Sequence, residues 1–370
     1  MVGVTLVLFV LSRYHSPQLA GLTALFSVLP GILVSPIAGA LLDRRGRARL
    51  MVLDYLVAAA AVLMIAGLAA LDALPPLVLM LVVGVASVTN PLSATGGRSL
   101  FPILAPPNLW ERVNALDSSG QVIASLVAPP VAGALVGFAG GEWALLVAGL
   151  GFLVGAAVML HLPDPAVKVA DQKSLFADAW LGLMYVVRNR TLRGLALTLT
   201  GINLGFGMLL IAIPVLVLGR LRLGPATVGF LWGAMGASGL VATLAAGRFP
   251  TRGRERQLML GSILLTAAAT AVLPFASALP VVLIVVIVIG FANGPFDIAM
   301  FTLRQRRTDP AWFGRAFAVS MSANYVGAPI GSALAGPLIA ASLDAALWAA
   351  AALSLASAVF PMRAIPARDD

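Results

Sequence analysis

Long apolar segments are the feature that most constrains how this 370-residue chain can fold. Most are about 20 residues long, the length that an α-helix needs to cross the hydrocarbon core of a bilayer. Turn-forming pairs such as Pro75-Pro76, Gly140-Gly141 and Gly224-Pro225 separate them. The apolar segments cover residues 2–12, 18–42, 50–71, 77–97, 114–137, 142–160, 192–218, 225–247, 257–276, 279–302, 315–340 and 343–362. We therefore expect an all-α polytopic membrane protein with twelve spanning helices.

The composition agrees with a bilayer environment. Hydrophobic residues make up 60% of the chain, charged residues make up 11%, and the mean hydropathy is +0.99. A soluble domain carries roughly 25% charged residues. The chain has no cysteine and two histidines, and it contains no phosphate-binding P-loop. We expect no catalytic residues, no metal site and no cofactor, so the sequence does not indicate an enzyme.

The first apolar segment is short for a spanning helix. Eleven residues precede Ser12, and a helix of that length reaches about 17 Å, roughly half of the hydrocarbon core. We expect a truncated first helix, either because the sequence starts inside it or because the start codon is misassigned. A cleaved signal peptide is less favoured, since the segment has no basic region and no clear cleavage site.

The positive charges predict the topology. If the loop that follows residue 42 is cytoplasmic and the loops alternate, all but three of the 24 lysines and arginines lie on the cytoplasmic side. The exceptions are Arg13, Arg220 and Arg222. This distribution places both termini in the cytoplasm of a bacterial cell, with the chain in its cytoplasmic membrane. Because the net charge of +9 resides in short inter-helix loops, we do not expect a nucleic-acid partner.

A central polar stretch divides the chain into two halves that share motifs in the same order. The expected division is a six-helix half at 1–160, a cytoplasmic linker at 161–191 and a second half at 192–370. Within the linker, the apolar spacing after Ser174 predicts an amphipathic helix on the membrane surface. The basic hairpin of residues 44–49 returns 207 positions later as Arg252-Gly253-Arg254-Glu255-Arg256. An even number of helices in each half makes this a parallel 6+6 pseudo-repeat.

These motifs resemble those of the major facilitator superfamily. The run Gly39-x-Leu41-x-Asp43-Arg44-x-Gly46-Arg47 is similar to its signature between helices 2 and 3. Further motifs resemble the bacterial efflux branch of enterobactin exporters, macrolide efflux proteins and transmembrane secretion effectors: Ser35-Pro36-x-x-Gly39…Asp54, Arg98-Ser-Leu-Phe-Pro102, Trp110-Glu111-Arg112-x-Asn114-Ala115 and Ala128-Pro129-Pro130-x-x-Gly133. The sequence departs from the family pattern at two places. The second hairpin has Pro250 where the first has Asp43. The antiporter signature Gly-Pro-x-x-Gly-Gly is replaced by Pro129-Pro130-Val-Ala-Gly133-Ala134.

The resemblance implies a role for the first basic hairpin. In this family such a cluster latches the two halves in the outward-facing state. The candidate latch residues are Gly39, Asp43, Arg44, Gly46, Arg47 and Asp54. The glycines allow close helix approach and a tight reversal, and the acids can pair with the arginines. The alternative is that the arginines only anchor the topology.

Polar residues inside the apolar segments mark a second candidate site, because such residues are unfavourable in lipid. The candidates for a proton and substrate site are Asp297, Asn293, Asp117, Gln121, Asn203 and Asn324. Asp297 lies seven residues before Arg304, about 10 Å into its helix, and without a partner its charged form is unfavourable, so it could carry a proton. The alternatives are structural pairs of Asp297 with Arg304 or Arg315, a pair of Asp117 with Arg112, and interhelical hydrogen bonds of the amides.

Together these features predict a secondary active transporter. We expect a monomer that exports an amphipathic small molecule of the drug or siderophore class by alternating access, with the proton as coupling ion. One alternative is a lipid or lysolipid carrier. Another is a non-transporting membrane sensor or an inactive truncated copy on the same scaffold.

Overall fold

All twelve predicted apolar segments are helical in the structure, a computed structural model that describes residues 1–163, 175–248, 253–309 and 313–365. Ten of the helical stretches are long and apolar enough to cross a membrane, and Val2–Tyr14 and Tyr325–Ala341 are shorter. The N-terminal helices are α1 (Val2–Tyr14), α2 (Pro17–Phe26), α3 (Leu29–Arg45), α4 (Arg47–Ala70), α5 (Pro76–Ser87), α6 (Asn90–Leu104), α7 (Trp110–Ala139) and α8 (Gly141–Leu160). The chain is therefore an all-helical polytopic membrane protein, as predicted.

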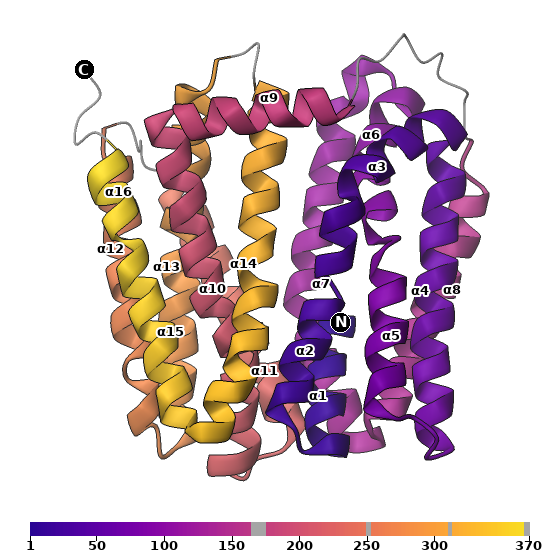
Figure 1. Cartoon of the computed structure of the whole chain (residues 1–370), viewed down its shortest axis with the longest axis vertical. Coiled ribbons are helices and arrows are strands. Elements are labelled where there is room, and N and C mark those ends of the chain that lie inside the picture. Colours follow the sequence, from indigo (N-terminus) through magenta and orange to yellow (C-terminus); the bar gives the residue numbers. More distant parts are fainter. Residues whose placement is uncertain (164–174, 249–252, 310–312, 366–370) are drawn as a thin grey trace.

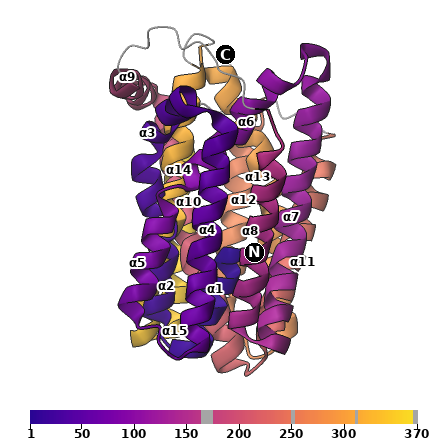
Figure 2. The ribbon, with the colours of Figure 1, turned by 90° about the vertical axis from the view of Figure 1, so that its right-hand side faces the viewer.

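The second group of helices forms a bundle beside the first (Figure 1). Its members are α10 (Arg190–Val215), α11 (Pro225–Ala246), α12 (Glu255–Thr270), α13 (Leu279–Arg307), α14 (Phe313–Ala341), α15 (Leu343–Ser357) and α16 (Val359–Ala364). Between the two groups, α9 (Leu175–Arg188) lies across one end of the molecule. Turned by 90°, the structure shows α9 at the outer edge of the helices (Figure 2). The α1–α8 group is the N-terminal bundle and the α10–α16 group is the C-terminal bundle.

Local sequence explains where several helices begin. The Ser16 hydroxyl accepts a hydrogen bond from the Leu19 amide at 3.1 Å, and Pro17 occupies the first turn of α2. The side chain of Asn189 accepts from the amides of Thr191 and Leu192 at the start of α10. These contacts satisfy amides that have no partner within their own helix.

The structure corrects the prediction for four segments that were each expected to be one helix. In the C-terminal bundle, residues 257–276 break between α12 and the 3-10 turn Leu273–Phe275, and residues 343–362 break between α15 and α16. In the N-terminal bundle, residues 18–42 break between α2 and α3, and residues 77–97 break between α5 and α6. The two breaks adjoin, because a Cβ at Gly31 would meet the Ser87 carbonyl oxygen. At this point the Asn90 side-chain amide donates to the Ser27 carbonyl at 3.3 Å. A side chain from one broken helix thus supplies a hydrogen bond to the backbone of the other.

Two of the exceptions to the charge distribution take part in equivalent contacts. Arg13 at the end of α1 donates to Asp72 at 2.8 Å and to Glu142 at the start of α8 at 3.3 Å. Arg220, which lies 207 positions later, pairs with Asp344 at the start of α15. Each arginine therefore ties the first and last spanning segments of its own bundle together. Neutralisation by these acids explains how the two cations can lie outside the cation-rich loops.

The bundles pack backbone against backbone at one end of the molecule. A Cβ at Gly133 of α7 would lie 2.8 Å from the Gly229 Cα of α11. On the other side, a Cβ at Gly336 of α14 would lie 2.5 Å from the Gln18 Cα of α2, and a Cβ at Gly21 would meet the Ser332 carbonyl. We call this the closed end. Only residues without a side chain permit such close approach.

The same helices separate toward the opposite end, which we call the open end. The contact between α7 and α11 continues as far as Leu126, whose Cδ1 would lie 3.5 Å from a Cβ at Gly236. Beyond it, residues 119–125 of α7 are all exposed. The α9 helix lies at this open end. Among the described residues, the close backbone contacts between the bundles therefore lie at the closed end.

The closed end can be tested with an engineered disulfide in this naturally cysteine-free chain. A Cβ at Gly137 would lie 3.5 Å from the Ala226 Cβ, within the range of disulfides. We expect Gly137→Cys/Ala226→Cys to cross-link under mild oxidation, seen as a mobility shift on a non-reducing gel. The matched control is Gly120→Cys/Thr243→Cys, on the same two helices toward the open end, which should not cross-link. Cross-linking of the control but not of the first pair would reverse the assignment of the ends.

Candidate functional site

An apolar cavity of about 240 Å³ lies between the two bundles. Helices α1 and α2 of the N-terminal bundle and α10, α11 and α14 of the C-terminal bundle contribute its walls. Its lining includes Val4, Leu8, Ala24, Pro214, Trp232 and Pro329. We call it the inter-bundle cavity. Because its walls come from both bundles, any movement of one bundle relative to the other changes its shape.

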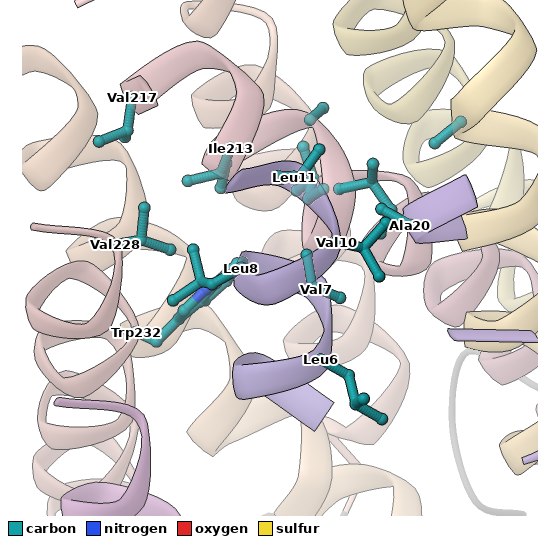
Figure 3. Close-up of a cluster of buried hydrophobic side chains, with 14 of the residues drawn as sticks. Leu6, Val7, Leu8, Val10, Leu11, Ala20, Ile213, Val217, Val228 and Trp232 are labelled. Carbon is teal, nitrogen blue, oxygen red and sulfur yellow. The ribbon is translucent and has the colours of Figure 1, made fainter. Parts of the chain in front are cut away.

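Residues of α1 line this cavity and also belong to the buried apolar core (Figure 3). Leu8 lies against Trp232 of α11, and Ile213, Val217 and Val228 surround them. Leu8 and Val228 are fully buried. These contacts join the N-terminal bundle to the C-terminal bundle through apolar side chains alone.

A second cavity, of about 350 Å³, lies within the C-terminal bundle. Three of the predicted site residues line it together, namely Asn203 on α10 and Asn293 and Asp297 on α13. The other lining residues are Leu199, Ile202, Phe206, Leu209, Thr266, Ile289, Phe296, Met300, Phe301, Tyr325 and Ser354. We call it the Asp297 cavity. The spacing i, i+4 explains why Asn293 and Asp297 share one face of α13.

The carboxylate of Asp297 is not paired with Arg304, one of the two partners considered from the sequence. It forms no hydrogen bond or ion pair with any residue in the described ranges. The residue is solvent-accessible and lines the Asp297 cavity. Arg304 is only 1% exposed, and its guanidinium lies 5.6 Å from the centroid of the Phe301 ring. The side chain of Arg315 lies outside the description. Asp297 is therefore available to a ligand or a proton.

The structure places Asp117 and Gln121 in the other bundle, on α7. The Gln121 amide donates to the Asp117 carboxylate at 2.8 Å. Gln121 belongs to the exposed stretch of α7 toward the open end. These two residues thus form a local pair on the opposite bundle from the Asp297 cavity. The side chain of Asn324, also predicted, lies outside what the structure describes.

The first basic hairpin has the tight backbone turn that its glycine predicts. Gly46 has φ of 95° between α3 and α4, and its repeat counterpart Gly253 has φ of 75°, a region that disfavours other residues. Asp54 on α4 is 4% exposed, and its Oδ1 has no hydrogen-bond partner among the described residues. The side chains of Asp43 and Arg44 lie outside the description, as does the surface of Gly39. Arg47 is partly buried beside this turn.

The second basic hairpin supplies an ion pair that the sequence analysis missed. Glu255, the first residue of α12, is 3% exposed and pairs with Arg306 near the end of α13. The signal available in the sequence was an acid at a helix start within a cationic loop. The pair joins α12 and α13, the two helices that contribute Thr266 and Asp297 to the Asp297 cavity.

Comparison with known proteins gives one family. The model of the Major Facilitator Superfamily matches residues 1–311 and 204–370. The chain is 38% identical over 366 residues to the uncharacterized MFS-type transporter y4rN of Sinorhizobium fredii, covering 97% of this chain and 89% of that protein. It is 30% identical over 365 residues to the multidrug efflux pump Tap of Mycobacterium tuberculosis, covering 94% and 86%. It is 25% identical over 250 residues to the enterobactin exporter EntS of Escherichia coli, covering 64% and 58%.

Solved structures share the fold. The nucleoside transporter NupG, as its D323A mutant, superposes with a TM-score of 0.75 at 14% identity and covers 98% of this chain and 95% of that one. A bacterial homologue of the iron transporter ferroportin, in an inward-facing state, gives 0.74 at 18% identity, with 98% and 94% covered. At these identities the similarity concerns the fold alone.

The ion pair between Glu255 and Arg306 generates a stability prediction. Glu255→Gln should lower the stability of the purified protein by about 1–2 kcal/mol, because a buried charged hydrogen bond is lost while its partner is partly screened by solvent. The measurement is thermal unfolding in detergent. The exchanged double variant Glu255→Arg/Arg306→Glu should recover part of the loss. If Glu255→Gln unfolds at the same temperature as the parent, the pair does not stabilise the bundle.

Proposed function

The chain belongs to the major facilitator superfamily, a family of membrane transporters and not of enzymes, and from this premise we propose that it exports amphipathic small molecules by alternating access. The observation that carries the proposal is the one-sided seal. Glycines press α7 on α11 and α2 on α14 at the closed end, while α7 is exposed toward the open end. A pair of bundles with one sealed end is one of the two states that alternating access requires.

The cavities support an amphipathic substrate. The inter-bundle cavity is almost entirely apolar, whereas the Asp297 cavity combines aromatic rings with a carboxylate and two amides. A molecule with an apolar and a polar part would find a complementary surface for each. Two relatives of the chain are a multidrug efflux pump and an enterobactin exporter, which favours export.

We assign the open end to the cytoplasm. The starts of α4 and α12, which follow the two basic hairpins in the sequence, lie at the α9 end, whereas Arg13 and Arg220 at the closed end pair with acids. This orientation follows the rule that cationic loops stay in the cytoplasm. Residues 1–160 and 192–370 then form the two moving halves, and 161–191 forms the linker between them. The carrier works as a monomer in the bacterial cytoplasmic membrane.

In this scheme the first hairpin acts as a latch for the opposite state. In the present state, in which the bundles are separated at the open end, Asp54 is buried and its Oδ1 has no hydrogen-bond partner among the described residues. Gly46 forms the turn between α3 and α4. When the cytoplasmic ends of the bundles approach, Gly39, Asp43, Arg44 and Arg47 come to the contact between them. Charge pairs made there would stabilise the outward-facing state.

The orientation can be tested by cysteine labelling in intact cells. Single cysteines at Arg47, Arg254 and Arg306 should be shielded from a membrane-impermeant thiol reagent, and cysteines at Asp72 and Asp344 should react. The reason is that the first group lies at the cytoplasmic end and the second group at the outer end. The parent provides an unlabelled background because it has no cysteine. The reverse labelling pattern would overturn the orientation.

Proton coupling can be tested at Asp297. Asp297→Asn should abolish uphill, proton-driven efflux, because an amide cannot release a proton. Downhill exchange at saturating substrate should persist, because the amide resembles the protonated acid. Both are measured on the same variant in proteoliposomes, with Asp72→Asn as the matched acid-to-amide control. If Asp297→Asn accumulates substrate uphill as well as the parent, Asp297 is not the coupling residue and Asp117 becomes the next candidate.

A further inference from the structure

We propose that the Asp297 cavity is a binding site for a lipophilic organic cation. This site lies within the C-terminal bundle. The inference deepens the proposed function, since it names the charge class of the exported molecule. All lining residues of the cavity come from α10, α12, α13, α14 and α15. Among the described residues, the site is therefore lined by the C-terminal bundle alone.

The charge of the lining favours a cation. Among the described residues, Asp297 is the only acidic residue that lines the cavity, and no basic residue lines it. The nearest basic residue along α13 is Arg304, which is only 1% exposed and faces Phe301. A carboxylate without an ion pair at this depth gains most from a cationic ligand, because charges in a low-dielectric site interact strongly. The same field repels an anionic ligand.

The rings around the carboxylate favour an organic cation over an inorganic one. Phe206, Phe296, Phe301 and Tyr325 all line the cavity. The faces of such rings attract ammonium and similar cations by about 0.5–2 kcal/mol each. A volume of about 350 Å³ lies within the range of small-molecule sites. A bare metal ion would leave most of this space and all of the rings unused.

An aromatic contact brings the two cavities close together, and we propose that one ligand uses both. Phe206 lines the Asp297 cavity and Trp232 lines the inter-bundle cavity. Their rings pack edge to face with centroids 6.0 Å apart. The cationic group of a ligand can therefore lie at Asp297 while an apolar tail extends past this aromatic pair. Movement of the bundles would then disturb the tail before it disturbs the charged group.

A proton competes with the cation for the same carboxylate. The described residues that line the cavity with Asp297 from the neighbouring helices include no charged side chain; the polar ones are Asn203 on α10, Thr266 on α12, Tyr325 on α14 and Ser354 on α15. Within α13, Asn293 is one turn away, and Arg304 turns to Phe301. Only one group is thus placed to exchange a proton for a cation. Binding of the cation should release about one proton at most.

The test is equilibrium binding to the purified, detergent-solubilised protein, which requires no transport. The probes are tetraphenylphosphonium and its anionic isostere tetraphenylborate. We expect the parent to bind the cation in preference to the anion, and Asp297→Asn to weaken cation binding by about tenfold or more. Asp297→Glu should retain part of the affinity. The matched control Asp72→Asn, an acid-to-amide change in the N-terminal bundle, should bind like the parent.

The outcomes separate this inference from the proposed function. Equal binding of both probes, or an unchanged affinity in a correctly folded Asp297→Asn protein, would overturn the cation site. If the parent does not bind tetraphenylphosphonium but exports another amphipathic molecule, the cation site is wrong and the exporter proposal stands. If Asp297→Asn elutes as an aggregate, the affinities of the folded Asp297→Glu and Phe301→Leu variants for tetraphenylphosphonium decide whether the cation site exists. Phe301→Leu should weaken cation binding, and parent-like affinity in both variants would also overturn the site.

Discussion

Close backbone packing between the two bundles at one end is the constraint on which the rest of the structure depends. Where α7 crosses α11 and α14 crosses α2, glycines leave no room for a Cβ. In a membrane, helix association relies on such van der Waals contact, because lipid is as apolar as the side chains. The contact is strong only while it is close, so a small rotation of the bundles would release it. This makes the seal suitable for a state that must form and dissolve in every cycle.

The distribution of the polar groups is consistent with the proposed movement of the bundles. Each bundle has its own internal contacts, with Arg13 and Arg220 holding the first and last spanning segments at the closed end and Glu255 holding Arg306 toward the other end. These ion pairs stay within one bundle and do not oppose rotation. Asp297, by contrast, has no such partner among the described residues. The groups that stabilise each bundle are thus separate from Asp297, the group that we propose binds the ligand.

Much of this architecture could be predicted from the sequence, because helix length and charge distribution follow directly from the bilayer. The clustering of Asn203, Asn293 and Asp297 was foreseen in part, since the helical period places Asn293 and Asp297 on one face. The breaks after α2 and α5 were not predicted, because the hydrogen bond between Asn90 and Ser27 that stabilises them joins segments far apart in sequence. The pairing of Glu255 with Arg306 was missed for the same reason. Long-range partners require the folded structure.

The central claim is that the two ends of the molecule open and close in opposition. The most direct measurement is a pair of distance distributions between spin labels, recorded with and without substrate in lipid nanodiscs. One label pair, at Asp72 and Asp344, reports on the closed end, and the other, at Arg49 and Arg254, reports on the open end. The account predicts that substrate or a change of pH lengthens the first distance as it shortens the second. Two distances that change in the same direction, or remain fixed during active transport, would contradict it.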